Sequence, residues 1–311
     1  MNLRPAPTAI RKKLFFLLEK NGHATGPLVN TERLLVVSED DVQEIPMKID
    51  PYIYNAVPFK NGVLYASYEY GDSGKCEWSV NYAEKGHTDL IDRGQCESYG
   101  NMPSIVYIGD IPYYQFTEKT SQGIWEGIKR VVDGEPELVF SYECSAMQEP
   151  LLVSNGTEYC YLMADGNHPT YIIGDESGIL YKNTIRKKMV DFGINDHTVV
   201  CSLAEDVNGE AEYEMLAIDL DTGEEKYSDA NQPYYRICGS GDAFLCVDWQ
   251  FGLYLINKEG DSIQPEAAEY PESPDLNKRS VFFYSQQEGR LLAKFYEDDY
   301  HEEAYYEIVV N

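Results

Sequence analysis

Short apolar runs, separated by turn-forming residues, recur along almost the whole chain. The clearest example spans residues 216–227, where an apolar run ends at Asp221-Thr222-Gly223 and a second short run follows. Two such runs on either side of a glycine-containing turn predict a β-hairpin. The chain lacks long stretches with helical periodicity, so the pattern favours an all-β protein over an α/β fold.

The hairpin belongs to a larger unit of two inner strands, a longer third strand, a turn and a short outer strand. The turns that close such units stand at Asp40, Gly86, Gly134, Gly178, Gly223 and Gly260, so the unit recurs about every 44 residues. This period is typical of propeller blades, because a lone four-stranded sheet leaves both faces open and radial stacking covers them. The sequence therefore predicts a β-propeller of four-stranded blades.

Seven units can be counted in this way. The expected strands are residues 14–19, 34–38 and 42–46; 52–59, 63–70, 76–83 and 88–91; 104–108, 112–117, 124–132 and 137–141; 151–153, 159–163, 170–173 and 179–184; 199–203, 213–220 and 225–227; 234–238, 243–249, 253–257 and 262–263; and 281–285, 291–296 and 304–310. We expect seven blades, with six or eight as alternatives, in a single domain spanning residues 1–311.

The first unit is incomplete and the last lacks an outer strand, so we expect strands from both ends of the chain to close the ring. A β-sandwich, or two small β domains, would also give short strands at regular spacing and is the alternative fold.

The chain carries 53 acidic and 25 basic residues, a formal net charge of -28. A field of this sign repels phosphate groups and anionic lipids, so the sequence excludes nucleic acid and membrane insertion from the expected interactions. Hydrophobic residues still make up 43% of the chain, and 26 of them are Tyr, which suits half-buried strand surfaces.

Seven cysteines are present without CxxC spacing, which predicts reduced thiols and no zinc. Near the N-terminus, Leu14-Phe15-Phe16-Leu17-Leu18 follows three basic residues, but five apolar residues are too few for a signal peptide or a membrane span. A cytoplasmic protein is expected if Met1 is the natural start. An extracellular or cell-surface location is the alternative if the natural chain is longer.

The run Ala217-Ile218-Asp219-Leu220-Asp221-Thr222-Gly223-Glu224 resembles the outer hairpin of bacterial propellers, among them the quinoprotein-like and TolB-like repeats. In those groups an apolar strand precedes an Asp-x-x-Thr-Gly turn. The Gly-His and Trp-Asp pairs of WD40 repeats and the paired glycines of kelch blades are missing. The resemblance implies a propeller fold and carries over no active site.

Motifs that could carry chemistry are weak. Asp219-Leu220-Asp221 imitates the start of a calcium loop, but the later ligands are missing and a hairpin turn is favoured. Asn155-Gly156-Thr157 is a glycosylation sequon, yet it reads first as a turn. The five histidines are scattered and GxSxG does not occur. We therefore expect no metal and no cofactor.

One candidate ligand site remains. The segments that lead into the inner strands should converge at one mouth of the propeller channel, and they are rich in aromatic and amide groups. The residues expected to bind a ligand there are Tyr52, Tyr54, Glu149, Tyr234, Tyr235 and Arg236. Tyrosines around a polar channel suit a carbohydrate or a peptide, and the acidic field favours a neutral or cationic ligand. The alternative is that these tyrosines only pack between blades.

Three functions remain open at this point. The first is a non-catalytic binding or scaffold propeller that presents this mouth to a carbohydrate, peptide or protein. The second is a carbohydrate-active enzyme, a glycoside hydrolase or lyase that uses channel carboxylates; acidic residues are too abundant here for their pairing to count in its favour. The third is a purely structural module of a larger assembly.

Overall fold

The computed structural model describes residues 2–5, 14–19, 29–37, 42–46, 52–70, 76–84, 87–96, 103–144, 151–163, 169–230, 233–240, 243–248, 253–257, 262–263, 281–287, 290–296 and 303–309. Every regular element in these ranges is a β-strand. The same ranges contain no helix with the length and apolar character needed to cross a bilayer.

The first half of the chain forms two sheets. One contains β2 (Leu14–Glu19), β3 (Val29–Val37), β5 (Tyr52–Phe59), β6 (Gly62–Tyr70), β7 (Cys76–Glu84) and β8 (His87–Cys96), with β4 (Val42–Pro46) on β3. Only two residue pairs join β3 to β5. The next sheet contains β9 (Ile105–Ile108), β10 (Ile111–Lys119), β11 (Ile124–Val132) and β12 (Glu135–Cys144).

Three more sheets follow, each of four antiparallel strands in chain order. They are β13 (Leu151–Ser154), β14 (Tyr159–Met163), β15 (Thr170–Asp175) and β16 (Gly178–Thr184); β17 (Lys188–Ile194), β18 (Thr198–Val207), β19 (Glu210–Asp219) and β20 (Glu225–Ala230); and β21 (Tyr234–Ser240), β22 (Ala243–Asp248), β23 (Leu253–Asn257) and β24 (Ser262–Ile263). The expected all-β class and four-stranded antiparallel sheets are confirmed.

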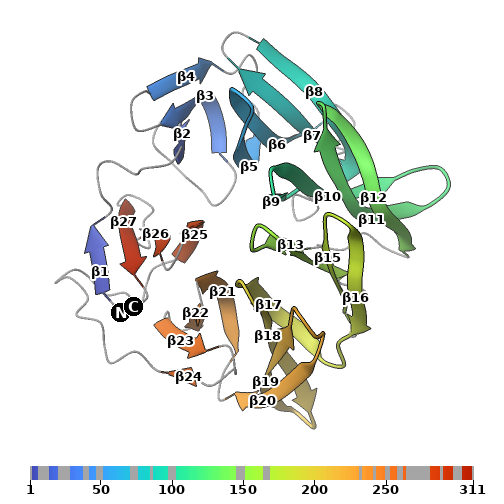
Figure 1. Cartoon of the computed structure of the whole chain (residues 1–311), viewed down its shortest axis with the longest axis vertical. Coiled ribbons are helices and arrows are strands. Elements are labelled where there is room, and N and C mark those ends of the chain that lie inside the picture. The colour runs from blue at the N-terminus through green and yellow to red at the C-terminus, as the bar shows by residue number, and fades with distance from the viewer. Residues whose placement is uncertain are drawn as a thin grey trace.

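The last sheet combines β25 (Val281–Gln287), β26 (Arg290–Tyr296) and β27 (Glu303–Val309) with β1 (Asn2–Pro5). β1 pairs antiparallel with β27, from Asn2 opposite Val309 to Pro5 opposite Tyr306. The sheets lie around a common centre, and β5, β9, β13, β17, β21 and β25 are the strands nearest to it (Figure 1). No sheet in the described part of the chain closes on itself.

The apolar cores lie between consecutive sheets, and β14 shows why. All five of its residues are buried. Tyr159, Tyr161 and Met163 pack against the β9–β12 sheet, whereas Cys160 and Leu162 pack against the β17–β20 sheet. Because alternate side chains of a strand point to opposite faces, this sheet is covered on both sides. The packing explains why its strands are apolar throughout instead of alternating.

Polar contacts also join neighbouring sheets. The indole Nε1 of Trp78 on β7 donates to the carbonyl oxygen of Thr117 on β10, at 2.7 Å. Asp92 on β8 accepts hydrogen bonds from the Tyr114 hydroxyl and the Lys129 ammonium, both at 2.7 Å. Each of these groups is at least partly withdrawn from water, so the contacts fix how the two sheets meet.

Two strands, β1 and β17, were missed by the sequence pattern. The fifth unit was expected to begin at residue 199, but β17 precedes it and starts directly after Lys187. Asp191 and Gly193 interrupt the apolar run of this innermost strand. The Asp191 carboxylate accepts a hydrogen bond from Ile237 N on β21, at 2.7 Å. A side chain at Gly193 would collide with Ile237. Both residues are therefore dictated by the neighbouring sheet.

Candidate functional site

The turn between β19 and β20 has the conformation expected of a hairpin. Asp219 Oδ1 accepts hydrogen bonds from the backbone N and the hydroxyl of Thr222, both at 2.8 Å. Gly223 follows with a φ of 71°, a left-handed conformation that glycine adopts without strain. The Asp-x-x-Thr-Gly sequence therefore closes the turn of a hairpin, as the sequence pattern predicted.

The pKa of Asp219 is lowered, first by the hydrogen bond from the Thr222 hydroxyl and then by that from its backbone N, with a further contribution from His197. The carboxylate therefore stays ionised at neutral pH. A general acid needs a raised pKa, so Asp219 is unsuited to that role.

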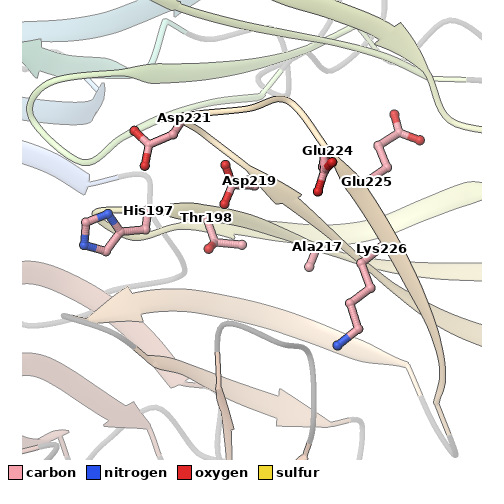
Figure 2. A pocket seen from close by; sticks show the side chains of 8 residues that line it. All are labelled: His197, Thr198, Ala217, Asp219, Asp221, Glu224, Glu225 and Lys226. Carbon is pink, nitrogen blue, oxygen red and sulfur yellow. The ribbon is translucent and has the colours of Figure 1, made fainter.

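A hollow of about 430 Å³ lies beside this turn (Figure 2). It is lined by His197, Thr198, Ala217, Asp219, Asp221, Glu224, Glu225 and Lys226. The turns after β17 and after β19 bring these residues together, because both turns lie at the same end of one sheet. In Figure 2 the side chains of Asp219, Asp221 and Glu224 are spread along the turn, while the Lys226 side chain runs away from it.

Glu225 is a link between sheets. Its Oε1 accepts hydrogen bonds from the Tyr171 hydroxyl at 2.8 Å and from Asn183 Nδ2 at 2.5 Å, both from the β13–β16 sheet. Burial, followed by the hydrogen bond to Glu225, raises the pKa of Tyr171. Since Tyr181 also donates to the Asp221 carbonyl oxygen at 2.7 Å, the rim of the hollow is built from two sheets.

Besides Asp219 and Glu225, two exposed carboxylates, Asp221 and Glu224, line the hollow, against one lysine, Lys226. They make its surface predominantly anionic, which suits a cationic group better than an anion. Among the described residues, no group of three or more His, Cys, Asp or Glu side chains is arranged to hold a metal ion.

Two thiols lie near this part of the molecule. Cys160 and Cys201 are free and fully buried in the core between the β13–β16 and β17–β20 sheets. Burial raises the pKa of both. They are therefore inert packing residues and not nucleophiles. Cys76 lies opposite Cys96 in the register of β7 and β8.

The sequence-predicted ligand residues fall on two innermost strands. Tyr52 and Tyr54 lie on β5, and Tyr234, Tyr235 and Arg236 lie on β21, which faces the same centre (Figure 1). Glu149 lies outside the described residues.

The side chain of Tyr234 is only 5% exposed. Its ring lies 5.4 Å from that of Tyr254, edge to face, and its backbone N donates to Ser202 Oγ at 2.9 Å. At this position the structure favours packing between sheets over contact with a ligand.

Asn155 was expected only to form a turn, but it also joins two sheets. Asn155 Oδ1 accepts from the backbone N of Thr157 and of Glu158, as an Asn-Gly turn predicts. Asn155 Nδ2 donates to the carbonyl oxygen of Asn195 in the next sheet, at 3.0 Å. The same nitrogen also donates to Glu158 Oε2 at 2.8 Å, and a glycan would replace one of its two hydrogens, so both contacts could not be kept. The sequence signal for these contacts was that turns recur at equal positions in successive units.

No family model and no curated protein matches the sequence. The β-propeller domain of the Trilobed protease from Pyrococcus furiosus superposes with a TM-score of 0.53 at 10% identity, over 79% of each chain. The chain is similar in fold to β-propeller proteins. The Pyrococcus horikoshii acylaminoacyl peptidase gives a TM-score of 0.50 at 11% identity, over 79% of this chain and 43% of its own. Chaetomium thermophilum Raptor gives 0.50 at 9% identity, over 100% of this chain and 29% of its own.

Proposed function

We propose that this chain is a non-catalytic binding or scaffold propeller. The proposal rests on the structural roles of the carboxylates that line the hollow. Asp219 closes a turn with a lowered pKa, and Glu225 is held by two side chains of the next sheet. Acidic side chains at this end of the sheet therefore hold the architecture together, and the surface that remains is suited to binding.

The proposed architecture has seven blades. The first is β2–β4, five blades follow from β5–β8 to β21–β24, and β25–β27 form the last. In this proposal β1 supplies the outer strand of the last blade and so closes a single ring. Support comes from the pairing of β1 with β27 and from the common centre that the inner strands face (Figure 1).

The proposed ligand is a neutral or cationic carbohydrate, peptide or protein segment at the channel mouth. Tyr52, Tyr54, Glu149, Tyr235 and Arg236 remain the proposed contacts, while Tyr234 supports β21 from within the core. The net charge of -28 would repel anionic ligands. Tyrosine rings offer apolar faces for stacking, and their hydroxyls orient a polar ligand.

The proposal is tested by presenting the purified chain to glycan and peptide arrays and, separately, to a panel of chromogenic glycosides and polysaccharides. Saturable binding without turnover is the expected result. Hydrolysis or elimination of a glycoside would instead establish the carbohydrate-active enzyme, and its loss in the Asp221→Asn, Glu224→Gln double variant would assign the reaction to the hollow. The matched control is the exposed pair Glu210→Gln, Glu212→Gln on β19, which lies away from the hollow.

A further inference from the structure

Four of the innermost strands carry a β-bulge in the same part of the strand. The residue pairing skips one residue in each: Tyr54 in β5, Val190 in β17, Tyr235 in β21 and Tyr284 in β25. A bulge inserts one unpaired residue and changes the direction of the side chains around it. It recurs on the strand nearest the centre in four sheets (Figure 1). The other register shifts of the described residues lie in the β2–β3, β7–β8, β11–β12 and β15–β16 pairs, away from these inner strands.

The bulges lie at similar heights along these strands. Between each bulge and the turn that ends the strand there are five residue pairs in β5, four in β17, five in β21 and three in β25. Asp191, the residue after the β17 bulge, accepts a hydrogen bond from the backbone N of Ile237, two residues after the β21 bulge. The bulges of these neighbouring strands are therefore level with each other to within about one residue, or about 3 Å.

The residue types at this level are also shared. Three of the four bulged residues are tyrosine. Each bulged residue is followed by a polar one: Asn55, Asp191, Arg236 and Ser285. Packing alone accounts for Asp191, whose carboxylate binds the neighbouring strand. Packing does not explain why three of the four unpaired bulge positions hold a tyrosine.

We propose that the bulges at Tyr54, Val190, Tyr235 and Tyr284 form one level around the centre of the molecule, and that its three tyrosines form a stacking platform for a neutral oligosaccharide. This inference rests on the proposed binding function and deepens it, because it names the ligand class and adds Tyr284 to the site. Tyrosine faces pack on the apolar faces of sugar rings, and the polar residues beside them supply hydrogen-bonding groups. An anionic sugar would be disfavoured by the charge of the chain.

The first test needs no substitution. The folded protein is treated with tetranitromethane, and nitrated tyrosines are mapped by mass spectrometry. We expect nitration of Tyr54, Tyr235 and Tyr284 at rates similar to Tyr227, which is 42% exposed on β20. Tyr161, which is 0% exposed, should react only after unfolding. If the three bulged tyrosines react as slowly as Tyr161, they are packing residues and the platform does not exist.

The second test measures binding of cellohexaose, maltohexaose and chitohexaose, with a hyaluronan hexasaccharide as the anionic comparison. Tyr54→Ala, Tyr235→Ala and Tyr284→Ala should each weaken binding of the preferred neutral sugar by about tenfold or more. Tyr227→Ala is the matched control and should change nothing. Val190→Tyr adds a fourth ring at the same level and should tighten binding severalfold. Urea midpoints equal to that of the wild type identify variants that are folded.

The outcomes separate this inference from the proposed function. Binding of a neutral hexasaccharide that survives all three Tyr→Ala changes overturns the platform and leaves a binding propeller. Binding of an array peptide but of no hexasaccharide overturns the carbohydrate assignment alone. A chain that binds neither, on any array, overturns both.

Discussion

At the scale of single residues, two buried polar side chains show how specific partners hold the sheets together. Tyr171 is 2% exposed and its hydroxyl donates to Glu225 across a sheet boundary. Glu126 is 0% exposed and accepts from the Tyr142 hydroxyl at 2.6 Å. A buried hydroxyl that loses its acceptor loses the hydrogen bond and is not rehydrated, so such pairs cost more to break than exposed ones.

We predict that Glu225→Ala lowers the free energy of unfolding by about 1–3 kcal/mol, because it leaves the Tyr171 hydroxyl without its acceptor. Glu224→Ala, at the neighbouring exposed position, should stay within about 0.5 kcal/mol of the wild type. Urea unfolding followed by tryptophan fluorescence measures both. Tyr171→Phe in the Glu225→Ala background should add little further loss. Equal effects of the two Glu variants would contradict the assigned contact.

A second residue-scale prediction concerns acid. The pKa values of Asp175 and Asp219 are both lowered, in each case mainly by a hydroxyl that donates to the carboxylate, from Ser177 and from Thr222. A lowered folded-state pKa gives stability that is present above the unfolded value of about 3.9. That stability is lost as the pH falls through the lower folded-state value.

The double variant Asp175→Asn, Asp219→Asn keeps a side-chain oxygen that can accept these hydrogen bonds but cannot titrate. We therefore expect it to be less stable than the wild type at pH 7, where it lacks the contribution of the ionised carboxylates. Its stability should fall less steeply below about pH 4, so that the two stability curves converge in acid. Thermal unfolding at half-unit pH steps provides the comparison. Parallel curves for the two proteins would show that these turns do not contribute to acid sensitivity.

At the scale of elements, the turns between the first two strands of successive sheets are joined to one another. Gly109 N donates to the carbonyl oxygen of Gly156 at 2.7 Å, and Asn155 Nδ2 donates to that of Asn195 at 3.0 Å. The hydroxyl of Ser154 reaches back to the Tyr107 carbonyl oxygen at 2.6 Å. A chain of polar contacts therefore runs across three sheets at one end of their inner strands, and it fixes the angle between them.

We predict that Asn155→Ala destabilises the fold by about 1–3 kcal/mol, because it removes both the turn-closing acceptor and the donor to the next sheet. Thr157→Ala, at an exposed position of the same turn, is the control and should be within about 0.5 kcal/mol of the wild type. Hydrogen exchange at the amides of Thr157 and Glu158 should quicken only in the Asn155 variant. Unchanged exchange there would rule out the closing role of Asn155.

The strands themselves show what local sequence can and cannot predict. β4, β5, β11 and β14 have the bounds expected from their apolar runs. β17 was missed because contacts with Ile237 in the next sheet, and not the pattern of their own strand, explain the presence of Asp191 and Gly193. The inner-strand location of Tyr54 and Tyr235 followed from the repeat. Their place in bulges did not, because a bulge depends on the register with a second strand.

At the scale of the whole molecule, the repeat predicted the number of strands per sheet and the need to cover both faces. The incomplete first and last units led us to expect a strand from the N-terminus, but not where it lies, because the four residues of β1, Asn-Leu-Arg-Pro, carry too little pattern to be recognised as a strand. Their conformation comes from the edge of β27, to which they are bonded in register. Contacts between residues so distant in sequence leave no local signature.

We predict that deletion of residues 2–5 lowers the urea midpoint and promotes association of the protein, because the edge of β27 becomes unpaired. A synthetic peptide of residues 1–9, added in excess, should bind the shortened protein and raise its midpoint again. Size-exclusion chromatography and urea unfolding report the two effects. A shortened protein with the midpoint of the wild type would argue against a role for β1 in the proposed closure.

The pairing of β1 with β27 also has a consequence for synthesis on the ribosome. The sheets β9–β12, β13–β16, β17–β20 and β21–β24 each use consecutive strands, so each can assemble soon after its own last strand has emerged. The sheet of β25–β27 and β1 joins the earliest described strand to the latest. Until β27 has been synthesised, β1 lacks the strand with which it pairs in the folded protein. The segment that contains β1 must therefore stay accessible and free of aggregation until β27 leaves the exit tunnel.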